Sequence, residues 1–206
     1  MARIVKADLE GLALAAGSVA KGGIICYPTD TVYGLGCDPL NSSAVKKAIA
    51  AKGKRTKAMP VLVKGTDDAE RLTYFSEPAK KLADRYWPGP LTVVLPTRDH
   101  VPSILAPRRT LGVRSPKHAI CQQLLGLCSG YLVGTSANLT GKPPAISAKE
   151  VEDQLGDQVD IILDGGRSPI GVSSTVVDLT ERSLSIVREG PVTRAEILQC
   201  LRQKSR

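Results

Sequence analysis

Short apolar runs alternate along this chain with segments of helical periodicity, and this alternation restricts the fold more than any other feature of the sequence. The runs IICY at 24–27 and LTVVL at 91–95 are typical of buried strands. Between Leu9 and Ala20 the apolar residues recur at the spacing of one helix face, which predicts a helix over 8–21. Elements that alternate in this way favour layers of helices packed on a sheet.

The same signals place the remaining elements in what we expect to be one domain over residues 1–206. We expect further strands at 61–63, 111–114, 131–134 and 159–163, and further helices at 42–51, 77–86, 117–127, 147–155 and after the capping-box pair Thr193 and Glu196. The runs STVVDL and LSIVRE, near 174–188, follow each other closely and predict a hairpin. Because a hairpin is antiparallel, the expected fold class is α/β (α+β) with a mixed sheet.

Charge and composition limit the function classes. The chain carries 28 Lys and Arg against 20 Asp and Glu, which gives a formal net charge of +8. A basic protein meets anions such as nucleotides, nucleic acid or acidic lipid, although a charge of this size also serves as an ordinary solubilising surface. Aromatic residues make up only 3% of the chain, so a surface that stacks on bases is poorly supplied.

Signals for metal and membrane are weak. Five cysteines without a C-x-x-C pair, and two histidines without a neighbouring ligand, predict reduced thiols of a cytoplasmic protein and no metal site. Asp8 and Glu10 interrupt the N-terminal segment, so we do not expect a signal peptide. No run approaches 18 apolar residues, so we expect no membrane span.

Polar clusters follow several of the apolar runs, at the strand ends where an α/β scaffold usually carries its site. The stretch PTDTVYGLG at 28–36 holds three hydroxyls, a carboxylate and two closely spaced glycines. We interpret Asp30 as a turn-stabilising residue and Tyr33 as a pocket wall or a core residue. The stretch AKGKRTK at 51–57 concentrates positive charge, which suits a polyphosphate but also a solvated helix C-terminus.

Two further features admit two interpretations each. The stretch GTSANLTG at 134–141 can donate to an anion through its backbone and short hydroxyls, or form a hydrogen-bonded turn. It is not a P-loop, because the chain has no G-x-x-x-x-G-K-[ST]. Arg114 and Arg188 end predicted strands, and each can bind a carboxylate or phosphate or form a surface ion pair.

Taken in order, these motifs resemble the YrdC/Sua5 family of threonylcarbamoyl-AMP synthases. The matching segments are PTDTVYGLG (28–36), KGKR (52–55), WPGPLTVVLP (87–96), LGVRSPKH (111–118), TSANLTGKP (135–143), DGG…GVSSTVVDLT (164–180) and VREG (187–190). The resemblance runs through nearly the whole chain and is closest to the short, single-domain form. It implies a twisted mixed sheet flanked by helices, with a basic concave cavity.

The resemblance also implies an activity, that of a nucleotidyltransferase. Family members form L-threonylcarbamoyladenylate and pyrophosphate from L-threonine, bicarbonate or CO₂, and ATP, which brings Mg²⁺. The product serves the N6-threonylcarbamoyl modification of adenosine 37 in tRNA, through a downstream tRNA threonylcarbamoyl transferase. Weak binding of tRNA by this chain itself is left open.

The family pattern assigns site residues position by position. Threonine would lie near Thr31, Arg114, Gly134, Ser174 and Lys64. ATP would lie near Lys52, Lys54, Thr110, Ser136, Asn138, Pro144 and Arg188, and the catalytic cations would be Lys52, Lys54 and Arg55.

Two positions depart from the family pattern. The K-x-R motif has Lys54 where arginine is usual, with Arg55 after it, and Lys64 stands where many members carry histidine. Lysine is a point charge and does not reproduce the bidentate fork of arginine. The alternative is therefore a divergent YrdC/YciO-like paralogue that binds nucleotide or structured RNA without forming threonylcarbamoyl-AMP.

Overall fold

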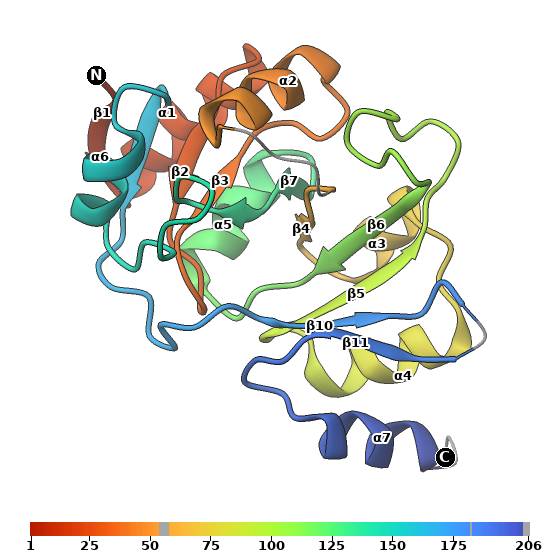
Figure 1. Cartoon of the computed structure of the whole chain (residues 1–206). Helices are drawn as coiled ribbons and strands as arrows, with labels where there is room; N and C mark the ends of the chain where they lie inside the picture. The colour runs from red at the N-terminus through yellow and green to blue at the C-terminus, as the bar shows by residue number, and fades with distance from the viewer. Residues whose placement is uncertain (54–57, 182, 204–206) are drawn as a thin grey trace.

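The strands form two mixed sheets, not the one sheet expected from the sequence (Figure 1). The computed structural model describes residues 1–53, 58–181 and 183–203. The first sheet has the order β1 (Arg3–Lys6), β9 (Ile161–Asp164), β2 (Ile25–Tyr27), β3 (Gly34–Gly36) and β8 (Thr135–Ser136). Its pairs β1–β9 and β9–β2 are parallel, and β2–β3 and β3–β8 are antiparallel.

The second sheet has six strands and supplies most of the scaffold of the site. Its order is β11 (Ser185–Arg188), β10 (Thr175–Asp178), β5 (Leu91–Pro96), β6 (Thr110–Arg114), β4 (Val61–Val63) and β7 (Tyr131–Val133). The pairs β10–β5 and β4–β6 are parallel, and the other three are antiparallel. The predicted hairpin of β10 and β11 and the mixed character of the sheet are confirmed.

Seven helices pack on the sheets within the part of the chain that the structure describes. They are α1 (Leu9–Ala20), α2 (Ser42–Ala51), α3 (Thr66–Leu72), α4 (Glu77–Tyr86), α5 (Ala119–Leu127), α6 (Ala148–Leu155) and α7 (Arg194–Arg202). In Figure 1, α1 and α6 lie beside β1 and contact its neighbour β9, whereas α4 contacts β5 and α7 packs on α4. None of these helices is long and apolar enough to cross a membrane.

Side chains next to the helices explain where they begin. Asp8, Asn41, Ser147 and Thr193 each accept a backbone N–H in the first turn of the following helix, and Thr193 with Glu196 completes the predicted capping box. These bonds satisfy donors that an α-helix leaves unpaired at its N-terminus. The starts of these four helices therefore follow from local chemistry.

Tyr27 joins the two sheets. Its ring is fully buried, and its hydroxyl donates to the Val133 carbonyl oxygen, 2.7 Å away, at the end of β7. The ring lies flat against β3, where a Cβ atom on Gly36 would stand only 2.5 Å from Tyr27 Cε1. The ring occupies the space that a side chain at position 36 would need, so glycine fits there. This explains one of the two glycines in the GLG stretch of β3.

Candidate functional site

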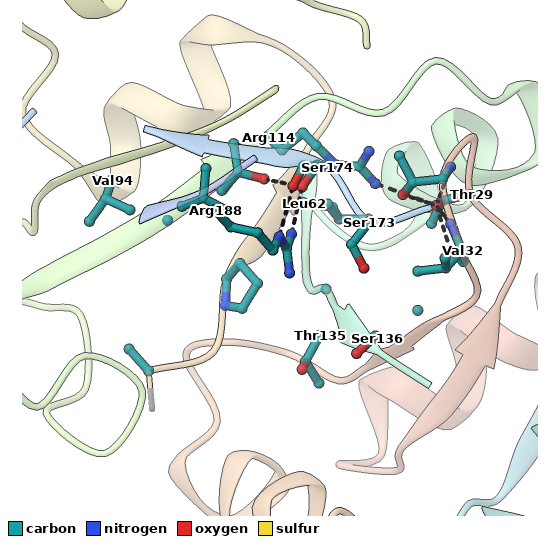
Figure 2. Close-up of a pocket in the computed structure, with 18 of the residues that line it drawn as sticks. Thr29, Val32, Leu62, Val94, Arg114, Thr135, Ser136, Ser173, Ser174 and Arg188 are labelled. Atoms are coloured by element: carbon teal, nitrogen blue, oxygen red, sulfur yellow. Dashed lines mark hydrogen bonds between the residues drawn. The ribbon is translucent and has the colours of Figure 1, made fainter. Parts of the chain in front are cut away.

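A cavity of about 710 Å³ opens between the two sheets (Figure 2). Its wall includes residues of β3 and β8 from the first sheet and of β5, β6, β10 and β11 from the second. Figure 2 shows Val94 at one end of the view and Thr29 and Val32 at the other, with Arg188, Ser174 and Arg114 between them. Strand ends that are distant in sequence therefore supply one site.

Arg114, the last residue of β6, is the most deeply held cation of the cavity wall. Its side chain is about 5% exposed, and it forms an ion pair with Asp30, with 3.2 Å between Nη1 and Oδ1. Nη2 donates to the Thr29 hydroxyl at 3.4 Å. Because guanidinium is planar and carries five N–H groups, these bonds leave further donors for a ligand.

Thr29, not Asp30, stabilises the turn at the start of this loop. The Thr29 Oγ1 atom accepts from the backbone N–H of Thr31 at 3.1 Å and donates to the Val32 carbonyl at 2.6 Å. The sequence-based interpretation of Asp30 as the turn residue is therefore wrong, because its carboxylate reaches across to β6. Tyr33 fills both roles considered for it: it is fully buried, and it lines the cavity.

Arg188 reaches the same cavity from β11 through a bulge. Val176 pairs with Arg188 and Val177 with Ile186, so Val187 is the extra residue, and both Val187 and Arg188 line the cavity. Arg188 donates from Nε to the Ser174 carbonyl at 2.9 Å and from Nη2 to the Ser174 hydroxyl at 3.1 Å. That hydroxyl also lies 2.8 Å from Thr92 Oγ1.

The two arginines influence each other electrostatically. Burial, and then the positive charge of Arg114, lower the pKa of Arg188 from its ordinary value. None of the described residues that line the cavity is acidic. Two cations that share a cavity without an acidic wall make a receptor for anions, which agrees with the expected basic character.

An apolar wall, formed by Pro60, Val94, Val176 and Val187, makes up another part of the cavity. Val187 is 62% exposed and lines the cavity, so a ligand bound there would cover apolar surface. The cavity therefore combines cationic, hydroxyl-bearing and apolar surfaces, and suits a ligand that has both anionic groups and a flat apolar part.

Lys52 lies behind the cavity wall and is only 2% exposed. Its ammonium group donates to the carbonyl oxygens of Ser136 and Asn138 and to the Asn138 side-chain oxygen, at 2.5, 2.8 and 3.4 Å. Asn138 in turn donates to the carbonyls of Leu139 and Lys142, at 2.8 and 2.7 Å. Lys52 and Asn138 thus fix the start of the loop after β8, next to Ser136, which lines the cavity.

The sequence-predicted site residues divide into four groups. Seven of them line the cavity: Thr31, Thr110, Arg114, Gly134, Ser136, Ser174 and Arg188. Lys52 and Asn138 lie behind the loop, whereas Lys64 and Pro144 are exposed and outside the cavity lining. Lys54 and Arg55 lie outside the described residues, so the structure gives no account of them.

Lys64 is displaced from the cavity for a geometric reason. It follows the last residue of β4, and its ammonium nitrogen lies near Gly126 of α5 and not in the cavity lining. Leu62, two residues earlier, lines the cavity instead and packs so closely on Gly134 that a Cβ atom there would stand 2.4 Å from Leu62 Cγ. The absence of a side chain at Gly134 therefore leaves room for Leu62 at the cavity wall.

The sequence reasoning missed Thr29, Thr92 and the apolar wall. Thr92 alternates with buried Leu91 and Val93 along β5, and this alternation was the available signal that it faces the opposite side of the sheet.

Cysteine chemistry has no place in the site: no cysteine lines the cavity, and burial raises the pKa of Cys37 to about 12 and that of Cys128 to about 11. Among the described residues, no group of three His, Cys, Asp or Glu is arranged to hold a metal ion.

Comparison with known proteins yields one family. Residues 18–190 match the family model Sua5_yciO_yrdC, which carries the description "Telomere recombination". A relative from Pyrococcus abyssi named threonylcarbamoyl-AMP synthase is 38% identical over 187 residues, which is 89% of this chain and 55% of that protein. The chain thus spans about half the length of this relative.

Two solved structures resemble the fold over nearly the whole chain. P. abyssi Sua5 complexed with L-threonine superposes with a TM-score of 0.91 at 36% identity, over 97% of this chain and 60% of that one. E. coli YciO superposes with a TM-score of 0.87 at 28% identity, over 96% of this chain and 100% of that one. Both branches considered from the sequence, the synthase and the YciO-like form, therefore share this architecture.

Proposed function

The chain belongs to the Sua5/YciO/YrdC family, and from this we propose that it is an L-threonylcarbamoyladenylate synthase, a nucleotidyltransferase. It converts L-threonine, bicarbonate or CO₂, and ATP into threonylcarbamoyl-AMP and pyrophosphate. The observation that carries the proposal is the buried Arg114 at the hydroxyl-rich end of a cavity that also holds Arg188. The P. abyssi relative and the threonine-bound Sua5 support it by their names.

Threonine binds at the Arg114 end of the cavity in this proposal. Its carboxylate pairs with the guanidinium, because arginine matches a carboxylate bidentately. Thr31 and Ser174 offer hydroxyls nearby, and the open space beside Gly134 admits the amino acid backbone. The amine must be neutral to attack CO₂, and the carbamate that results is a second anion in a cavity of positive potential.

ATP occupies the remaining cavity, with its base toward the apolar wall and its phosphates toward Thr110, Ser136 and Arg188. The carbamate oxygen attacks the α-phosphorus in line with the departing pyrophosphate. This step depends on positioning and charge neutralisation and needs no covalent nucleophile, which fits a lining that has no histidine or cysteine among the described residues. Mg²⁺ arrives on the phosphates of ATP and keeps mainly water and phosphate ligands, because the described wall has no carboxylate.

Lys52 contributes indirectly in this account. Its three hydrogen bonds to loop oxygens hold Ser136 at the cavity wall, and the positive charge remains behind the phosphates. Lys54 and Arg55 are the further cations of the proposal by family resemblance alone. The product is passed to a downstream tRNA threonylcarbamoyl transferase in the cytoplasm, and the net charge of +8 allows weak tRNA binding.

Pyrophosphate release tests the proposal. Purified protein with ATP, Mg²⁺ and bicarbonate should release pyrophosphate with L-threonine and far less with L-serine or no amino acid. Arg114→Ala should abolish the threonine-dependent part, whereas Arg71→Ala, at an exposed arginine of α3 outside the cavity lining, should keep it. Release that ignores threonine, or its absence in a protein that still binds ATP or RNA, would favour the YciO-like alternative.

A further inference from the structure

The ion pair of Asp30 and Arg114 joins a loop to the cavity from behind. Asp30 is 2% exposed and Arg114 is 4% exposed, yet only Arg114 lines the cavity. Asp30 therefore contacts the guanidinium from the side that faces away from the cavity. A ligand in the cavity would contact Arg114 and not Asp30. The Asp30 carboxylate has no path to act on the substrate as a base.

The backbone of Asp30 is fixed by a second loop. The N–H of Ile170 donates to the Asp30 carbonyl at 3.0 Å, and the N–H of Gly171 donates to the Thr31 carbonyl at 2.9 Å. The Thr29 hydroxyl binds the Thr31 N–H from within the same loop. Asp30 is thus held on both sides, so its carboxylate offers Arg114 a rigid partner.

One carboxylate oxygen of Asp30 lacks a hydrogen-bond partner, which is not expected of an ion pair that serves only to stabilise the fold. Among the described residues, the Asp30 Oδ2 atom is buried without a hydrogen-bond partner, while Oδ1 accepts from Arg114 Nη1. A buried carboxylate oxygen without a donor costs stability. A feature that costs stability and is directed at one residue of a binding site is typical of a residue kept for function.

We propose that Asp30 is a positioning residue that orients the Arg114 guanidinium for the substrate carboxylate. Asp30 holds Nη1 and Thr29 holds Nη2, so the plane of the guanidinium is fixed before the ligand arrives. A guanidinium whose orientation is already fixed loses less conformational entropy when it binds a carboxylate. The affinity for the amino acid therefore rises, while the affinity for ATP does not change. This inference deepens the proposed function and rests on it.

Asp30→Asn tests the proposal, because asparagine keeps the size of the side chain and removes its charge. We expect the KM for threonine to rise on the order of tenfold or more, the cost of weakening one charged hydrogen bond, with the KM for ATP unchanged. A merely structural role would lower the amount of active protein and leave both KM values as they are. Asp38→Asn is the matched control, since the Asp38 carboxylate accepts the Leu40 N–H at 2.8 Å and lies outside the cavity lining.

A measurement on the wild-type protein covers the case in which Asp30→Asn does not fold. Nitrogen-15 NMR of the Arg114 guanidinium, assigned by its loss in Arg114→Lys, should show separate Nη–H signals from a group that rotates slowly. Rapid rotation would overturn the proposal, as would an unchanged threonine KM in a folded Asp30→Asn variant. If the wild type shows no threonine-dependent pyrophosphate release at all, the proposed function fails, and the assignment of the carboxylate fails with it.

Discussion

Replacing Lys52 by methionine tests whether this buried lysine holds the loop after β8 in place. Methionine keeps the length and apolar contacts of the side chain and removes the ammonium group, which donates to oxygens of Ser136 and Asn138. If Lys52 holds the loop, as its bonds indicate, both the stability of the protein and the KM for ATP should change.

The magnitude follows from the bonds lost. A hydrogen bond from a charged group contributes about 1.5–3 kcal/mol, but Lys52→Met also removes the desolvation cost of the ammonium group, so we expect a net loss of about 2 kcal/mol. At about 2–4 °C per kcal/mol for a domain of this size, the Tm should fall by about 4–8 °C. The loop that carries Ser136 then loosens, and the KM for ATP should rise.

Urea unfolding gives the free energy of unfolding of the Lys52 variant, and initial-rate kinetics give its KM for ATP. Lys47→Met is the control, because it makes the same change within α2, the helix that Lys52 follows. Lys47 is exposed, and its ammonium group donates to the Gly22 carbonyl at 3.1 Å. The control should lie within about 0.5 kcal/mol of the wild type. If Lys52→Met is as stable as Lys47→Met and has an unchanged KM, the reasoning about the loop is refuted.

Two further predictions concern pH and glycine. Burial lowers the pKa of His118, so below the ordinary histidine pKa of about 6.5 the unfolded chain binds more protons than the folded one, and stability falls as the pH falls. His118→Asn, which keeps an acceptor for the Cys121 N–H, should flatten this part of the pH profile of urea unfolding; an unchanged profile contradicts it. Gly36→Ala should strongly destabilise the protein by forcing Tyr27 aside, whereas exposed Gly17→Ala, in α1 with free space around it, should stabilise it by about 0.5–1 kcal/mol, and equal melting temperatures would refute both.

Local signals predicted most of the fold because they depend on neighbours in the sequence. The capping box of Thr193 and Glu196 and the run LTVVL are examples, and the structure has both a helix and a strand there. The strand β3 (Gly34–Gly36) was missed because GLG has no β-branched residue, and it is held by long-range pairing with β8 as well as by β2 and the ring of Tyr27. The division of the strands into two sheets is likewise a matter of long-range pairing.

The same distinction explains the site. Arg114 could be predicted from the residues because it ends a strand and strand ends gather at a site, whereas Ser174 was assigned by the family resemblance alone. The ion-pair partner of Asp30 could not be predicted, because Arg114 lies 84 positions further along the chain. The position of Lys52 behind its loop also depends on contacts 84 and 86 positions away, which no local pattern records.

The most direct test of the central claim is the identity of the nucleotide product. Wild-type protein with ATP, Mg²⁺, L-threonine and [¹³C]bicarbonate should form, by mass spectrometry, a threonylcarbamoyl adenylate that carries one labelled carbon and is lost in Arg114→Ala. An adenylate without the labelled carbon, or no adenylate from a protein that binds ATP, would contradict the account.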